Sequence, residues 1–107
     1  MTFYAIYDPD SDLYLTADLQ PKLDKLGKNT QLFISRSEAE RRIQIRRHGL
    51  DTTILQNDLA FWLLEKVYKK DIWHINVSFD EFMDACSQFK NLRVEELCLE
   101  RQKLKRK

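Results

Sequence analysis

The sequence contains few of the residues that small disulfide-stapled domains and phosphate-binding loops need. Its 107 residues include two cysteines, two glycines, two prolines and two histidines. Cys86 and Cys98 lie twelve residues apart without a C-x-x-C motif, and a small secreted domain would normally carry a larger set of cysteines. Glycine occurs only at positions 27 and 49, so there is no Gly-rich phosphate loop. The two thiols therefore fit a reducing compartment inside a cell.

Long apolar runs and a strong net charge are also missing. No stretch approaches the roughly 18 apolar residues that a membrane-spanning helix requires, and the N-terminal MTFYAIYDPD lacks the basic and apolar regions of a signal peptide. We therefore expect a cytoplasmic protein without membrane contact. The 18 basic and 17 acidic side chains give a formal net charge of +1. Only the distribution of charge, and not its sum, can therefore indicate a partner.

The composition is typical of a globular protein. Apolar residues make up 43% of the chain and charged residues 33%. A chain of this length buries roughly two thirds of its unfolded surface, which is enough for a core without disulfides. We expect residues 1–107 to form a single domain.

The start of the chain predicts a β-hairpin. Residues 2–8 (TFYAIYD) place aromatic or aliphatic side chains on both faces of a strand, which is typical of a central strand. Residues 13–16 (LYLT) predict a second short strand. The residues between them, DPDSD at 8–12, are turn formers, so the two strands should pair.

The next segment predicts a loop, a strand and a helix. Residues 17–30 form the loop, which has room for one helical turn, and residues 31–35 (QLFIS) resemble a third strand. Ser35 and Glu38 have the spacing of a capping box that opens the helix. Gly49 is suited to end that helix in the left-handed conformation.

Two more helices are expected in the second half. Apolar spacing predicts a helix at 57–69, whereas residues 52–56 fit either its start or a last strand. Residues 73–77 (WHINV) favour a short strand. Ser78 and Glu81 form another capping box, which opens the next helix. The expected apolar face of that helix comprises Phe79, Phe82, Met83, Cys86 and Phe89.

The last segment, residues 93–107, predicts a helix that frays into a basic tail. The chain would thus contain a ββ-β-α module at 1–50, a helical part at 51–100 and the basic tail at 101–107. Strands followed by helices favour the α+β class. We expect a small antiparallel sheet, formed by the N-terminal hairpin plus one or two strands and packed with three to four helices, and a mainly helical C-terminal half.

Three aspartates in the predicted turn raise the question of a calcium site. Asp8, Asp10 and Asp12 match the first three ligand positions of an EF-hand loop. Such a loop needs Gly at its sixth position and Glu at its twelfth, where this chain has Leu13 and Leu19. We therefore predict no metal site, and interpret the aspartates as an acidic turn.

Two clusters of basic residues have the chemistry to contact a polyanion. The first lies in the predicted helix after Ser35 and consists of Arg41, Arg42, Arg46 and Arg47. Arg guanidinium groups match phosphate oxygens, but a solvated helix face with Glu38 paired to Arg41 or Arg42 explains the same pattern. The second cluster, in the predicted tail, comprises Arg101, Lys103 and Lys105. These residues either contact a polyanion or complement the dipole of a helix C-terminus.

Catalytic motifs are missing from the sequence. His48 and His74 are isolated and belong to no H-E-x-x-H motif, and there is no G-x-S-x-G. Cys86 falls on the apolar face of a predicted helix, which is typical of a core thiol. We therefore expect no enzyme and no cofactor.

Three tyrosines fall on the predicted sheet. Tyr4, Tyr7 and Tyr14 on an exposed sheet face would be able to stack nucleic-acid bases or contact a protein. The favoured interpretation is that helices cover both faces of the sheet.

The pattern Tyr4 to Tyr7, Tyr14-Leu15, Leu32-Phe33, Ser35 and Glu38-Ala39-Glu40 spans roughly half the chain. This half resembles a module found in many short phage and prophage open reading frames of Gram-positive bacteria. The resemblance implies a small accessory protein with a ββ-β-α start. Small phage proteins of this kind include inhibitors of host defence, among them anti-CRISPR proteins.

Two hypotheses for function follow. In the first, the chain is a non-enzymatic protein–protein interaction module of phage origin that inhibits a host machine such as a CRISPR effector nuclease. Its partner would be a host protein or a nucleoprotein complex, and the chain itself could form a homodimer. The acidic residues Asp8, Asp10, Asp12 and Asp18 would mimic phosphates in a basic groove. In the second, the chain binds nucleic acid through the Arg-rich helix and the basic tail.

Overall fold

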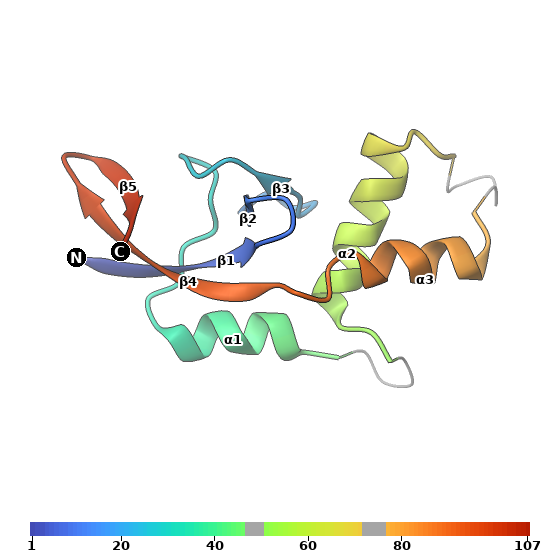
Figure 1. The fold of residues 1–107 in the computed structure, drawn as a ribbon, viewed down its shortest axis with the longest axis horizontal. Coiled ribbons are helices and arrows are strands. Elements are labelled where there is room, and N and C mark those ends of the chain that lie inside the picture. Colours follow the sequence, from blue (N-terminus) through green and yellow to red (C-terminus); the bar gives the residue numbers. More distant parts are fainter. Residues whose placement is uncertain (47–50, 72–76) are drawn as a thin grey trace.

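The chain folds as an α+β protein with an antiparallel sheet of five strands and, within the described residues, three α-helices (Figure 1). The structure, a computed structural model, describes residues 1–46, 51–71 and 77–107. The strands are β1 (Thr2–Asp8), β2 (Leu13–Leu15), β3 (Leu23–Asp24), β4 (Arg93–Glu100) and β5 (Lys103–Arg106). The helices are α1 (Arg36–Gln44), α2 (Ile54–Trp62) and α3 (Phe79–Ser87). The predicted α+β class is confirmed.

Strand β1 occupies the centre of the sheet, whose order is β3-β2-β1-β4-β5. Along one side, Thr2 to Tyr7 pair with β4, and on the other side Tyr7 pairs with Tyr14 of β2. A strand with neighbours on both sides can bury side chains on both faces. This position accounts for the apolar residues on the two faces of β1, as the sequence predicted.

Residues 9–12 connect β1 to β2, so the predicted hairpin is confirmed. The Asp12 N–H donates to the Asp8 carbonyl at 2.8 Å. Asp12 has a φ of 61°, a left-handed conformation that aspartate tolerates better than most residues. The turn therefore depends on this aspartate for its backbone shape.

The third strand lies elsewhere than predicted. It comprises Leu23–Asp24, inside the segment expected to be a loop, and pairs with β2. Of the expected strand at 31–35, only Phe33 forms a β-bridge, in which it exchanges backbone hydrogen bonds of 2.8 and 2.9 Å with Tyr4, and the Gln31 N–H donates to the Leu15 carbonyl at 2.9 Å. Strand β2 is too short to pair with the whole of β1, so a single residue fills the vacant edge before α1 begins.

The expectation of a final helix and a basic tail is wrong, because residues 93–106 form the β4–β5 hairpin. The segment carries both acidic and basic residues. In the structure the same charges pair across strands: Glu96 Oε2 lies 3.6 Å from Lys107 Nζ, and Glu100 Oε1 lies 3.7 Å from Lys105 Nζ. The unpaired edge of β1 gives this segment a partner that local sequence does not reveal.

The tight turn of the β4–β5 hairpin has an unusual composition. Its two central residues, Arg101 and Gln102, have φ angles of 51° and 63°. A two-residue turn with positive φ at both positions normally contains Asn-Gly or Asp-Gly. Arg-Gln carries no such signal, so the hairpin could not be predicted from its turn.

Serine and threonine caps open the helices. Ser35 accepts a hydrogen bond from the Glu38 N–H at 3.2 Å, so the predicted N-cap is confirmed, but within the described residues no return bond from the Glu38 side chain completes the capping box. Helix α1 already ends at Gln44. The expected C-terminal residue Gly49 lies outside the described residues, and so does the predicted strand at 73–77 except for its last residue. Ser78 accepts from the N–H of Glu81 at 3.1 Å and opens α3 as predicted, whereas the Glu81 carboxylate lies 3.7 Å from Lys70 Nζ and does not complete a capping box.

A capping box that the sequence analysis did not recognise decides the structure of residues 52–56. The Thr53 hydroxyl accepts from the Gln56 N–H at 3.1 Å, and the Gln56 side chain accepts from the Thr53 N–H at 2.9 Å. Helix α2 therefore begins at Ile54, before the predicted start. It continues as a π-helix at Leu63–Val67, in which both Leu63 and Leu64 are buried.

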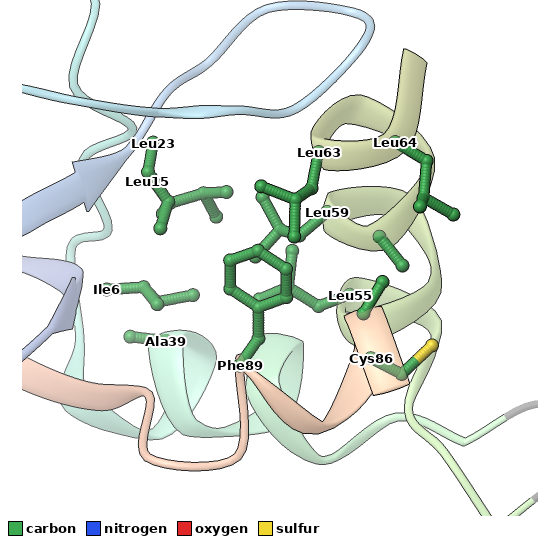
Figure 2. Close-up of a cluster of buried hydrophobic side chains, with 12 residues drawn as sticks. Ile6, Leu15, Leu23, Ala39, Leu55, Leu59, Leu63, Leu64, Cys86 and Phe89 are labelled. Carbon is green, nitrogen blue, oxygen red and sulfur yellow. The ribbon is translucent and has the colours of Figure 1, made fainter. Parts of the chain in front are cut away.

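The main core lies between the sheet, α1, α2 and α3. Helix α1 runs along one face of the sheet, and α2 and α3 pack at the end of the molecule opposite the β4–β5 hairpin (Figure 1). Figure 2 shows the ring of Phe89 between Ile6 and Leu15 of the sheet and Leu59 of α2 and Leu63 of the π-helix that follows it. On the expected apolar face of α3, Cys86 and Phe89 are buried, Phe82 and Met83 are half-buried, and Phe79 is exposed.

A second, smaller core lies on the other face of the sheet. Ala5, Tyr7, Tyr14 and Leu97 are buried there. Within the described residues, the side chains that pack over this cluster are Leu26 and Leu32 from the β3–α1 connection, and no helix contributes. The expectation that helices cover both faces is therefore wrong, and this face is covered by a loop and a hairpin.

Candidate functional site

The three aspartates of the β1–β2 turn hold the turn together. Asp8 is 3% exposed, and its carboxylate accepts from the Asp10 N–H at 3.3 Å and the Ser11 hydroxyl at 2.8 Å. Asp10 accepts from the Asn91 amide at 3.1 Å, and Asp12 accepts from the Tyr7 hydroxyl at 2.6 Å. Asp8 is thus enclosed, whereas Asp10 and Asp12 remain exposed with protein donors already bound.

The same contacts show how the three aspartates are arranged with respect to a calcium site. The three carboxylates bind separate donors of the chain. Among the described residues, no group of three or more His, Cys, Asp and Glu side chains is arranged to hold a metal ion.

Arg106 joins the β4–β5 hairpin to the first hairpin. Its Nε donates to the Tyr14 hydroxyl at 2.6 Å, and its Nη2 donates to Asp12 Oδ1 at 2.7 Å. Its guanidinium carbon lies 4.3 Å from the centre of the Tyr7 ring, a cation–π geometry. Tyr7 and Tyr14 are almost fully buried, so the arginine covers the tyrosine pair. We call Arg106, Asp12, Tyr7 and Tyr14 the clasp.

The clasp shifts the titration of its members. The hydrogen bond from Tyr7 lowers the pKa of Asp12, and the nearby charge of Arg106 acts in the same direction. The same hydrogen bond raises the pKa of Tyr7, because Asp12 accepts the phenolic proton. The hydrogen bond to Tyr14 raises the pKa of Arg106. The contacts of the clasp are therefore all formed from acidic to strongly alkaline pH.

The predicted arginine stripe is divided, because Arg41 and Arg42 lie on α1 whereas Arg46 lies beyond its end and forms a β-bridge with Thr53. Arg42 lies 3.6 Å from Asp58 of α2, and Arg46 donates to the backbone carbonyl of Asp51 at 3.4 Å. Arg41 is exposed, and Arg47 lies outside the described residues. The helix thus presents fewer free guanidinium groups than the sequence suggested.

The basic residues of the predicted tail have different environments on the β4–β5 hairpin. Arg101 is exposed in the turn, and Lys103 is exposed at the start of β5. Lys105 lies 3.7 Å from the Glu100 carboxylate. Neither Arg101 nor Lys103 has a carboxylate within ion-pair distance among the described residues. The hairpin therefore carries two cations that the fold does not neutralise.

Lys103 borders a groove between the hairpin and the β3–α1 connection. The groove has a volume of about 600 Å³. Its lining consists of Phe3, Leu26, Gly27, Lys28, Thr30, Leu32, Leu99, Gln102, Lys103 and Leu104. A second hollow of about 480 Å³, which shares Leu26 with the groove, continues toward Lys25 and the clasp. Loop and hairpin thus form an open trough with an apolar floor.

The charge along the trough is one-sided. Lys25 and Lys28 are exposed on the loop side, opposite Lys103 on the hairpin. The groove lining contains no acidic residue, and Asp12 in the second hollow is paired with Arg106. Among the described residues, no carboxylate lies within ion-pair distance of these three lysines. The trough combines apolar contact with net positive charge.

The sequence analysis did not identify most of this surface. It named Lys103 but not Lys25, Lys28 or the leucines of the groove. A usable signal was present in residues 97–106, where Leu97 and Leu99 lie two positions apart, at strand spacing, and Leu104 stands between Lys103 and Lys105. The loop side carried no comparable signal, because its leucines become neighbours of the hairpin only through the fold.

The chain matches no protein-family model, no curated protein and no solved structure. Among the residues that the structure describes, no helix combines the length and the apolar character needed to cross a membrane. The interpretation of function therefore depends on the geometry described above.

Proposed function

We propose that the protein is a non-enzymatic protein-binding module whose contact surface is the groove between the β3–α1 connection and the β4–β5 hairpin. The observation that carries the proposal is an apolar hollow of about 600 Å³ that opens between lysines without anionic partners in the described chain. Leu99, at 46% exposure, is among the apolar side chains that the fold leaves uncovered there. A contiguous apolar surface with a polar rim is typical of an interaction site.

The lining supports binding rather than catalysis. Its polar members are two lysines, a threonine and a glutamine beside five large apolar side chains. This set offers surface to bury and charge to attract, but it does not pair an acid with a base. Its chemistry suits a partner that is apolar and negatively charged.

The biological role extends the proposal. On the basis of the resemblance to short phage reading frames, we propose that the module acts in a host cell by binding and inhibiting a protein machine such as a CRISPR effector nuclease. The purified chain, added in molar excess to such a nuclease, should then reduce cleavage of target DNA. Unchanged cleavage by a panel of these nucleases would remove this role and leave the binding proposal in place.

Site-specific photo-crosslinking tests the binding proposal. A benzophenone amino acid in place of Leu104 should form a covalent adduct with one discrete partner when the chain is expressed in its native cells. The matched control is Leu19, which is fully exposed and outside the groove, and it should give no such adduct. Equal labelling from Leu19 and Leu104, or none from Leu104 and Leu32, would contradict the proposed surface.

Nucleic-acid binding is the second candidate, and one observation favours it. Lys25, Lys28 and Lys103 line one trough without ion-pair partners among the described residues, and Arg101 is exposed in the adjacent β4–β5 turn. Gel shifts with single-stranded and duplex DNA and RNA at about 50 and 200 mM salt would measure it, since phosphate contacts weaken steeply with salt. Salt-sensitive binding that is lost in Lys28→Glu/Lys103→Glu would support nucleic acid as the partner.

A further inference from the structure

We propose that the groove receives an extended acidic segment of the partner protein, which pairs with the outer edge of β5 as an additional strand. This inference rests on the proposed function and names the chemistry and the backbone conformation of the bound segment. Three observations lead to it: the free edge of β5, the apolar groove beside that edge, and the unpaired lysines around the groove.

The pairing register leaves one edge of β5 open. Glu100 pairs with Lys103 across the two-residue turn, so this pair exchanges ladder hydrogen bonds, and the pattern then alternates along the hairpin. The N–H and C=O groups of Leu104 and Arg106 therefore point away from β4. In the described part of the chain none of these four groups has a hydrogen-bond partner, and β5 is the last strand of the sheet.

The groove lies beside this edge and can receive side chains. Leu104 is itself part of the lining, with Leu26 and Leu32 on the opposite wall. In an added strand every second side chain would point to the same face as Leu104. Main-chain hydrogen bonds would supply the pairing, and apolar side chains at alternate positions would fill the hollow.

The lysines beside this edge favour an incoming strand with acidic side chains over one with basic side chains. An incoming carboxylate would meet Lys28 and Lys103, which have no acidic partner among the described residues. A second copy of this chain would instead place the K-L-K-R sequence of β5 beside itself, with like charges facing each other. The edge therefore disfavours self-pairing and favours an acidic segment.

Synthetic peptides test the inference on the whole chain by NMR. The probe is a ten-residue peptide in which Glu alternates with Val, and the comparison peptides are its Lys–Val counterpart and a Glu–Val peptide with alternate N-methylated amides. The Glu–Val peptide should shift the amide signals of Leu104 and Arg106 and slow their hydrogen exchange at least tenfold. The two comparison peptides should bind at least tenfold more weakly.

Two variants separate the backbone contribution from the charge. Leu104→Pro removes an outward N–H that the β4–β5 ladder does not use. This variant should therefore lose binding of the Glu–Val peptide, while the amide signals of Cys98 and Lys105 stay in place. If this variant unfolds the hairpin, Lys28→Glu/Lys103→Glu serves instead. It should weaken Glu–Val binding at least tenfold and favour the Lys–Val peptide, whereas Lys69→Glu/Lys90→Glu, with the same change of charge outside the groove, should not.

The outcomes are distinct. Glu–Val binding that leaves Leu104 and Arg106 unchanged, or that tolerates N-methylation, would overturn strand addition. A single-stranded DNA oligonucleotide that binds when the Glu–Val peptide does not would overturn the acidic protein segment as occupant. A partner crosslinked at Leu104 that still binds Leu104→Pro would also refute strand addition while the proposed protein-binding function stands. Failure of the crosslink itself would instead refute the proposed function.

Discussion

The β4–β5 turn provides a direct test of how this hairpin is stabilised. Arg101 and Gln102 both have left-handed φ angles, and both side chains are exposed. A residue with a Cβ atom costs about 1–2 kcal/mol in this conformation, whereas Gly does not and Asn tolerates it better. Replacing the pair by Asn-Gly should therefore stabilise the native state.

The net gain is smaller than the strain that is relieved. Gly raises the conformational entropy of the unfolded chain, which offsets the stabilisation by roughly 0.5–1 kcal/mol. We expect Arg101→Asn/Gln102→Gly to raise the free energy of unfolding by about 1 kcal/mol. For a domain of roughly this size that gain corresponds to a Tm increase of about 4–8 °C. Urea denaturation should show a higher midpoint with an unchanged slope.

A matched control distinguishes backbone relief from removal of the side chains. Arg101→Ala/Gln102→Ala removes the same exposed side chains but keeps a Cβ atom at each position, so it should not stabilise the chain. If Asn-Gly leaves the midpoint unchanged or lowers it, the left-handed turn does not limit the stability of the hairpin. If the Ala pair stabilises equally, the side chains and not the backbone carry the cost.

Other features of the fold make separate predictions. Asn57 is buried, its Oδ1 accepts from the Thr52 hydroxyl at 2.7 Å, and its Nδ2 has no partner in the described chain. Thr52→Val/Asn57→Leu should leave the free energy of unfolding unchanged or raise it by about 1 kcal/mol, whereas Asn57→Ala should lower it by about 2 kcal/mol in urea denaturation. Thr53→Ala removes the capping box of α2 and should cost about 1 kcal/mol by the same measurement, whereas Ser37→Ala, at an exposed site within α1, should cost much less. The pKa of Asp12 is lowered in the folded state, so its stabilising effect is present above about pH 4 and is lost as the pH falls further; Asp12→Asn should flatten the acid limb of a pH–Tm curve, and an unaltered limb would contradict the clasp. Burial raises the pKa of Cys86 to about 11, so iodoacetamide at pH 8 should modify the half-buried Cys98 in the folded chain before Cys86, as read by mass spectrometry.

The sequence predicted the elements whose signals are local. The hairpin of β1 and β2 follows from a two-sided apolar strand and a D-P-D-S-D turn, and Ser35 and Ser78 cap helices where their spacing indicated. In each case the residues that carry the signal contact one another within a few positions. The capping box of Thr53 and Gln56 is equally local, and it would have assigned residues 52–56 to the start of α2.

The elements that the sequence analysis misassigned depend on distant partners. Strand β4 pairs along β1, more than eighty residues away in the chain, and this pairing overrides a charge pattern that also suits a helix. Strand β3 has two residues, too few for any periodicity. The β4–β5 turn gave no sequence signal either, because Arg101 and Gln102 occupy the two left-handed positions where Asn-Gly is usual.

The candidate groove lies between these misassigned segments, and the same physical reason explains why its residues could not be listed from the sequence. The basic residues of the hairpin divide according to their partners across the fold. Lys105, Arg106 and Lys107 pair with Glu100, Asp12 and Glu96, whereas Arg101 and Lys103 have no such partner among the described residues. In the sequence RQKLKRK they are indistinguishable. In the structure the paired cations hold the hairpin in place, and the unpaired ones are available to a ligand. Charge reversal at the first group should therefore lower stability, and charge reversal at the second should lower binding with little change in stability.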